Sequence, residues 1–385
     1  MSAAAGRVDF PAPVGVDGFY QPRRAAFWLV VFFIANGLFS VTTNLVTAYR
    51  VVPTAVLVGL VLWGLYTVPV LLFFRWMDLL EQHPPLGFAL AFAWGGLAAV
   101  YLAIPANAAI LSLASKLRGP EFAAEWGPAL AGPPVEETLK ILGVILLVLV
   151  ARTQFPTILS VVVTGAMVGL GFQVVEDLTY SLNTAVAFPA DNEVLPVLLM
   201  LGTRGIVSGI WSHAMYTSIA AFGVGYFLVR RNEPFARRLG VAVLAYVLAM
   251  GVHFFWNSPS FQDWGFLPQV VIHAIPVVVV GYLIWLLAGR DEATYLKALA
   301  DHFVATDLIT EEERGALVSM RVRHRARKRM RKAHGRRAGR ALRDLQREQL
   351  RLVMYHGRHG AGAHLVDREY AVHRARARVE AESAR

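Results

Sequence analysis

Two carboxylates and two imidazoles lie inside long apolar stretches of this sequence, where ionisable groups are otherwise scarce. They are Glu136, Glu176, His213 and His253. A charged side chain in the middle of a membrane-spanning helix costs about 2.5–3.5 kcal/mol on insertion scales, so such residues usually have a function. Carboxylates and imidazoles activate water, transfer protons and bind zinc. Their types therefore indicate hydrolysis, metal binding or proton transfer within a membrane.

Helical spacing places further side chains beside these four. Three pairs are four residues apart: Glu136 with Lys140, Phe172 with Glu176, and His253 with Asn257. Residues at i and i+4 share one face of a helix, so we expect each pair to point the same way. Glu137 adds a second carboxylate next to the first. The preceding Pro133-Pro134 predicts a broken first helical turn, which membranes tolerate where the backbone lines a wet cavity.

The composition identifies the elements that carry these residues as transmembrane helices. Of 385 residues, 56% are hydrophobic and 17% are charged, whereas about 25% is charged in soluble domains. The chain has no cysteine, which excludes disulfides, zinc ribbons and thiol catalysis. A helix that crosses a ~30 Å hydrocarbon core needs about 20 apolar residues. Eight stretches meet this requirement: 25–48, 53–74, 87–114, 128–150, 157–180, 206–229, 239–257 and 266–288.

We therefore predict an all-α, polytopic bundle of about eight transmembrane helices with a basic cytoplasmic tail. Residues 1–24 read as a flexible cytoplasmic lead, 25–288 as the transmembrane core, and 289–385 as the tail. The apolar segment 193–203 is too short to cross alone. It is interpreted as a re-entrant or interfacial piece, or as an early start of the sixth span.

Lysine and arginine gather at alternate ends of these stretches, which predicts that both termini lie in the cytoplasm of a multi-pass plasma-membrane protein. In that orientation Glu136 and His213 lie about eight residues from the outer ends of their helices. Glu176 and His253 lie within about five. At a rise of 1.5 Å per residue, all four are expected roughly 5–13 Å below the outer surface.

The motifs Glu136-Glu137-x-x-Lys140, Phe172-x-x-x-Glu176, the mid-span His213 and His253-x-x-x-Asn257 resemble those of the PrsW intramembrane proteases. These are distant relatives of the CAAX prenyl-protein endopeptidase and bacteriocin-processing proteases. The resemblance covers about 128–288. It implies proteolysis of membrane-anchored proteins, typically the first-site cleavage of an anti-sigma factor near the outer membrane face.

Two chemistries use the same residues and stay open at this point. In the first, Glu136 (or its rival Glu137) is the general base for water, while His253 and Asn257 donate to the oxyanion. His213 then holds the water or protonates the leaving amine, and Lys140 and Phe172 support the site. In the second, four residues form a zinc site: Glu136, Glu176, His213 and His253. No His-Glu-x-x-His motif occurs in the sequence.

A proton-coupled transporter is the alternative function, because intramembrane Glu and His residues also form proton relays. Paired discontinuous segments in two related halves would favour it, and only one such segment is apparent. A serine protease is disfavoured, because no Gly-x-Ser-x-Gly motif occurs and Ser212 cannot form a dyad with the adjacent His213.

The tail has a different composition from the rest of the chain. Residues 321–385 contain 20 Lys+Arg and 6 Asp+Glu, a surplus of +14, whereas the whole chain carries +10. We expect 321–385 to bind anionic lipid headgroups. Nucleic acid is disfavoured, because only Tyr355 and Tyr370 are available there for stacking. The acid-rich 291–313 predicts short soluble helices, with Thr310 as an N-cap.

Overall fold

The protein is helical throughout the residues that its computed structural model describes, which are 17–77, 85–188, 192–209, 212–360 and 363–384. Its helices form two compact units, and the boundary between them falls within one helix, α10 (Phe266–Val304). The membrane unit contains the helices up to Ala288, and the C-terminal unit begins at Gly289. Helical membrane architecture, as predicted from composition, is confirmed.

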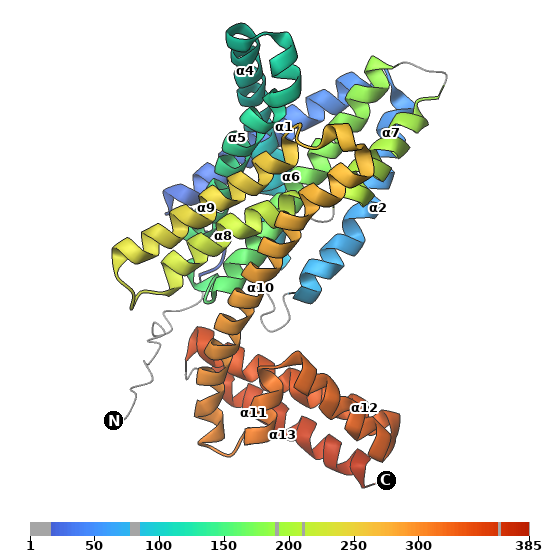
Figure 1. The fold of residues 1–385 in the computed structure, drawn as a ribbon. Helices are drawn as coiled ribbons and strands as arrows, with labels where there is room; N and C mark the ends of the chain where they lie inside the picture. The colour runs from blue at the N-terminus through green and yellow to red at the C-terminus, as the bar shows by residue number, and fades with distance from the viewer. Residues whose placement is uncertain (1–16, 78–84, 189–191, 210–211, 361–362, 385) are drawn as a thin grey trace. The chain divides into compact units, whose positions relative to one another are not determined.

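Six described helices of the chain are long and apolar enough to span a membrane (Figure 1). They are α1 (Ala25–Tyr49), α2 (Pro53–Met77), the continuous α3 (Pro85–Ala93), η1 (Trp94–Ala99) and α4 (Val100–Arg118), α6 (Ile158–Ala187), α9 (Phe235–Asn257) and α10. Helix α5 (Pro120–Val150) carries Glu136, Glu137 and Lys140 in its apolar half, and α8 (His213–Val229) has 17 residues. The count of eight spans therefore stays a prediction.

The expected continuous span over 206–229 is wrong. Residues of its first part belong instead to a short apolar helix, α7 (Val194–Met200) with the π-helical η3 (Leu201–Ser208). Helix α8 starts only at His213, after Ser212 with φ −83° and ψ −112°. Glycines at 202, 205 and 209 weaken the helix in this region. The break places His213 in the first turn of a helix rather than in mid-span.

The broken turn expected at Pro133-Pro134 is also wrong. Helix α5 is continuous from Pro120 to Val150 and contains both prolines. It begins earlier than expected because Pro120, at the first helical position, follows Gly119, whose φ of +94° ends the preceding helix. Prolines inside membrane helices are tolerated where neighbouring segments compensate for the lost backbone hydrogen bonds.

Helix α6 is the centre of the membrane unit. In the most apolar 18-residue window of α6, 94% is buried inside the protein, whereas the share is 28% or less in the corresponding windows of the other five candidate spans. Glycines let neighbouring backbones approach it closely: a Cβ on Gly169 would lie 2.2 Å from the carbonyl oxygen of His213, and one on Gly95 would lie 1.8 Å from that of Val168. Small residues at helix interfaces in membranes have this effect. The contact at Gly169 sets how closely His213 approaches α6.

Residues before α1 are partly held against the membrane unit. Phe19 is 6% exposed and packs edge-on against Phe155, with ring centroids 6.3 Å apart. Arg24 donates to the carbonyl oxygen of Val150 at 2.6 Å. Of the flexible lead expected over 1–24, residues 1–16 lie outside the described part of the chain.

The C-terminal unit has its own hydrophobic core, formed by residues such as Leu296, Phe303 and Leu352. Helix α10 continues to Val304, because its apolar positions keep helical spacing. The prediction of short helices from 291 onward is therefore wrong as far as Val304. The predicted N-cap is confirmed: Thr310 accepts from the Glu313 N–H, and the Glu313 carboxylate accepts from the Thr310 N–H, at the start of α11 (Glu311–Leu317). Helices α12 (Met320–His359) and α13 (Ala363–Ser383) complete the unit.

We expect a Gly169→Ala variant to be destabilised by about 1–3 kcal/mol, because the added methyl group overlaps the backbone of α8. Gly64→Ala in α2 is the matched control, since a Cβ there meets nothing within 4 Å. Thermal unfolding of both purified proteins in one detergent measures the difference. Equal midpoints for the two variants would contradict the close packing of α6 on α8.

Candidate active site

Four helices bring the predicted residues together in the membrane unit. Helix α5 supplies Glu136, Glu137 and Lys140, α6 supplies Phe172 and Glu176, α8 supplies His213, and α9 supplies His253 and Asn257. One oxygen of Glu136 and one nitrogen each of His213 and His253 lie within 4.8 Å of one another, and all three residues are buried. The sequence spacing thus identified side chains that share one site.

Glu137 is the most completely bonded carboxylate of the site. Lys140 Nζ lies 2.6 Å from Glu137 Oε1, and His253 Nδ1 lies 2.9 Å from the same oxygen. The hydroxyl of Thr217 donates to the other oxygen at 3.2 Å. Glu137 and Lys140 are both 0% exposed. A buried charge is tolerated when it is paired and hydrogen-bonded in this way, so Glu137 holds the helices in register.

The neighbouring groups determine which nitrogen of each imidazole carries a proton. A carboxylate only accepts hydrogen bonds, so His253 Nδ1 donates to Glu137 and its Nε2 keeps a lone pair. An ammonium group only donates, so His213 Nδ1 accepts from Lys140 at 2.9 Å. His213 Nε2 then donates to Glu176 Oε2 at 3.0 Å. Both imidazoles are thereby oriented by a carboxylate partner.

Glu136 has one oxygen that no hydrogen bond occupies. Its Oε1 accepts from Asn107 at 3.1 Å, whereas its buried Oε2 has no hydrogen-bond partner. This Oε2 lies 3.7 Å from His213 Nδ1 and 3.9 Å from His253 Nε2, the two nitrogens that carry lone pairs. Lys140 Nζ also lies 3.7 Å away. A buried polar atom without a partner calls for an explanation, and a bound water or ion supplies one.

Asn257 lies at the edge of this group. Its side-chain nitrogen donates to the carbonyl oxygen of Pro128 at 3.2 Å. A Cβ on Gly132 would lie 3.0 Å from that nitrogen and 3.2 Å from Glu136 Oε1. Because Gly132 has no side chain, the space between the amide and the carboxylate stays open.

Phe172 covers the polar group from α6. Its ring centroid lies 4.5 Å from Lys140 Nζ and 5.1 Å from the ring of His213. An aromatic face near an ammonium group attracts it electrostatically. Phe172 therefore stabilises the position of Lys140 in addition to packing.

The family model for the PrsW family intramembrane metalloprotease matches residues 83–288, which include all of these side chains. The chain belongs to this family. It is a multi-pass membrane protein and a protease, that is, a peptide hydrolase. Comparison with curated proteins gave no match, and comparison with solved structures gave none either.

An arginine that the sequence analysis missed completes the site of this PrsW-family protein. Arg204 Nη2 lies 2.9 Å from Glu176 Oε2, and its Nε lies 2.5 Å from Asp177 Oδ1. Its guanidinium also lies over the ring of Tyr180, 4.1 Å from the centroid. Asp177 is 1% exposed, so its carboxylate is buried and is not a solvated helix end. An arginine within the apolar run 194–207 was the signal available in the sequence.

Two further polar residues, His273 and Ser212, do not join the PrsW-family site. His273 is surrounded by aromatic rings, with Phe255 at 4.6 Å and Trp256 at 6.2 Å between centroids. Ser212 donates to Gln173 Oε1 at 3.2 Å and is not paired with an imidazole. The hydroxyl of Ser212 therefore has a structural partner rather than a catalytic base.

We expect Arg204→Gln to lower kcat about 10- to 100-fold with KM nearly unchanged, the usual cost of losing a partner that orients an active-site ligand. Arg204 holds Glu176, which in turn orients His213, so the effect is on chemistry and not on substrate binding. Arg204→Lys keeps the charge but not the two-pronged contact and should fall between. Arg50→Gln, at an exposed position, is the control. A rise in KM alone would contradict a positioning role.

Proposed function

We propose that this protein is an endopeptidase that cleaves membrane-anchored proteins near the outer membrane face, with water activated at Glu136. The observation that supports it is the buried Oε2 of Glu136, which has no hydrogen-bond partner and faces two imidazole nitrogens. Membership of a protease family gives the reaction, hydrolysis of a peptide bond. The proposal assigns that reaction to particular atoms.

In the absence of a metal ion, Glu136 acts as general base in this proposal, and Glu137 does not. Oε2 of Glu136 is available to a water, whereas both oxygens of Glu137 already accept hydrogen bonds. A positioned carboxylate takes the proton of the attacking water and then passes it to the leaving amine. His213 was a candidate for that last step, but both of its nitrogens are engaged.

Asn257 is the proposed donor to the oxyanion. Its amide lies beside the space left open by Gly132, next to Glu136. A carbonyl oxygen entering there would meet the N–H donor of Asn257 close to Glu136. Donors aimed at the developing negative charge typically contribute a large share of catalysis.

A divalent metal ion fits the same group, and zinc is the ion that these donors suit. Glu136, His213 and His253 would hold it, because one carboxylate oxygen and two imidazole nitrogens are usual zinc ligands. Each imidazole already donates its other N–H to a carboxylate, as metal-bound histidines usually do. Zinc would supply a Lewis acid that makes a bound water more acidic. Glu176, expected among the ligands, is instead the partner that orients His213.

Lys140 limits this metal site in a specific way. Its ammonium group donates to His213 Nδ1, which is the lone pair that a metal ion would use. Metal binding and this hydrogen bond therefore exclude each other. The proposal requires Lys140 to turn wholly to the carboxylates Glu137 and Glu136, at 2.6 and 3.7 Å, when an ion enters.

The substrate class follows from the membrane setting and from the family resemblance. We propose a membrane-anchored protein such as an anti-sigma factor, cut at the first site of a proteolytic cascade. In this proposal the protein lies in the plasma membrane with both termini in the cytoplasm, and the basic residues 321–385 contact anionic headgroups.

Glu136→Gln should lower the rate of substrate cleavage by about 10²–10⁴-fold, the usual contribution of a general base. Glu125→Gln, an exposed change of the same kind on the same helix, should cleave at the wild-type rate. Both are measured with a membrane-anchored fluorogenic peptide in detergent. Cleavage by Glu136→Gln at the wild-type rate would refute the assignment.

Removal of metal should abolish cleavage, and added zinc should restore it. Elemental analysis of the purified wild-type protein should find about one zinc per chain, since one three-residue site is present in the described part of the chain. Glu136→Gln and His253→Ala should each reduce the zinc content. Full activity of metal-free protein would instead favour a glutamate protease that uses the same residues.

A further inference from the structure

A polar cavity lies in the C-terminal unit, between the two halves of α12. This helix consists of two halves that meet at Gly335, where φ is +84° and ψ is 179°. Glycine adopts this conformation without the strain of a side chain. The halves pack against each other: Arg327 Nε donates to Gln346 Oε1 at 2.6 Å, and a Cβ on Gly339 would lie 3.0 Å from that of Arg331. A cavity of about 350 Å³ lies between them.

The lining of this cavity carries positive charge from both halves and no carboxylate. Its permanent cations are Arg327, Lys328, Arg331, Arg336, Arg340 and Arg343. None of the six forms an ion pair with a described residue within 4.0 Å. His324 and Gly339 complete the lining. We call this group the basic cavity.

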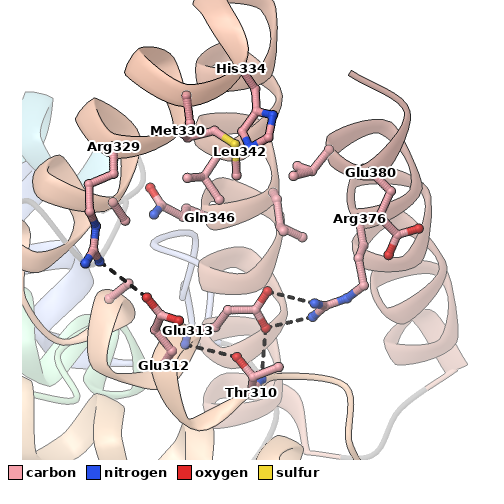
Figure 2. Close-up of a pocket in the computed structure, with 15 residues that line it drawn as sticks. Thr310, Glu312, Glu313, Arg329, Met330, His334, Leu342, Gln346, Arg376 and Glu380 are labelled. Atoms are coloured by element: carbon pink, nitrogen blue, oxygen red, sulfur yellow. Dashed lines mark hydrogen bonds and ion pairs between the residues drawn. The ribbon is translucent and has the colours of Figure 1, made fainter. Parts of the chain in front are cut away.

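A neighbouring cavity in the same unit shows the contrast (Figure 2). Its two arginines are paired with acids: Arg376 contacts Glu313 at 2.7 Å, and Arg329 contacts Glu312 at 3.3 Å. Two glutamates thus balance the positive charge there. The basic cavity has no such balance, although it lies along the same helix.

Like charges gather at the basic cavity. Burial, and then the nearby Arg343 and Arg347, lower the pKa of the Arg327 guanidinium, whereas Asp344 acts in the opposite direction. Positive groups near one another repel, and an anion bound among them reduces that repulsion. Most of the lining cations are exposed, so the cavity offers positive charge to a ligand that arrives from solution or from a membrane surface.

We propose that the basic cavity binds a compact anion with two or more phosphate groups, either free in solution or as a phospholipid headgroup. The planar guanidinium group of arginine donates two parallel, charge-assisted hydrogen bonds to phosphate oxygens. About 350 Å³ is at the small end of ligand pockets, which suits a diphosphate-sized group. Its lining has no Phe, Tyr or Trp ring, the side chains that most often stack on nucleobases.

The test uses the full-length protein in phosphatidylcholine nanodiscs, with inorganic pyrophosphate as the probe in calorimetric titration. Arg331→Gln/Arg340→Gln removes two charges from the lining. Arg325→Gln/Arg337→Gln removes two exposed charges from the same helix but outside the lining. We expect at least about tenfold weaker binding for the first and less than about threefold for the second, because hydrogen bonds between charged groups carry about 1.5–3 kcal/mol. Arg331→Lys/Arg340→Lys, which keeps the charge, should fall between.

A second arm separates the two sources of phosphate. Nanodiscs with cardiolipin are compared with phosphatidylserine nanodiscs of equal surface charge. A cardiolipin headgroup in the cavity would compete with pyrophosphate. Weaker pyrophosphate binding in cardiolipin than in phosphatidylserine nanodiscs, seen in wild type and not in Arg331→Gln/Arg340→Gln, therefore supports a headgroup in the cavity. Equal pyrophosphate binding in the two lipids supports a free ligand.

Three results would overturn the proposal: no pyrophosphate binding by the wild type, equal loss in the lining and control variants, or tight binding only of a single-stranded oligonucleotide. Circular dichroism of each variant checks that the helices are intact. Wild-type-like spectra with unchanged binding in Arg331→Gln/Arg340→Gln would also refute it.

Discussion

The buried ion pair between Glu137 and Lys140 is the interaction on which the site depends. Both side chains are fully buried, and the lysine nitrogen lies 2.6 Å from the carboxylate. Desolvating two charges is costly and is repaid only when further hydrogen bonds complete the pair. Thr217 from α8 and His253 from α9 provide them. The need to satisfy Glu137 therefore fixes three helices relative to one another and aims His253 at Glu136.

Helix α6 provides the second constraint, through backbone proximity rather than charge. Gly169 of α6 lets the carbonyl of His213 approach more closely than a side chain would permit, and Gly95 of η1 does the same for the carbonyl of Val168 in α6. From the same helix Glu176 contacts His213, and Arg204 holds Glu176 in place. Each imidazole is thus oriented by its own glutamate, one from α5 and one from α6. The carboxylate oxygen without a hydrogen bond that faces both imidazoles, Oε2 of Glu136, is where this PrsW-family protein is proposed to activate water.

The C-terminal unit uses arginine in two different ways. Around α11 and α13 arginines are paired with glutamates and help to fix the helices, as Arg376 does with Glu313. Within α12 the lining arginines form no ion pair within 4.0 Å among the described residues, and the net charge is left for a ligand. Surface ion pairs contribute little stability, whereas a cluster of like charges around one cavity favours the binding of an anion. The proposed phosphate site and the proposed protease site lie in separate units, so each can be tested by itself.

Composition and residue spacing were enough to predict the membrane class, the helical fold, the family resemblance and most members of the polar group. These depend on local properties: the length of apolar runs, the cost of an ionisable residue within them, and the i,i+4 spacing of pairs such as His253 and Asn257. The cap at Thr310 was likewise local. Three features came from the packing of the helices: Glu137 is fully hydrogen-bonded while Oε2 of Glu136 is not, Arg204 belongs to the site, and α8 begins at His213. Those features depend on contacts between residues far apart in the chain. The spacing of residues within one helix does not show which side chains of another helix will contact them.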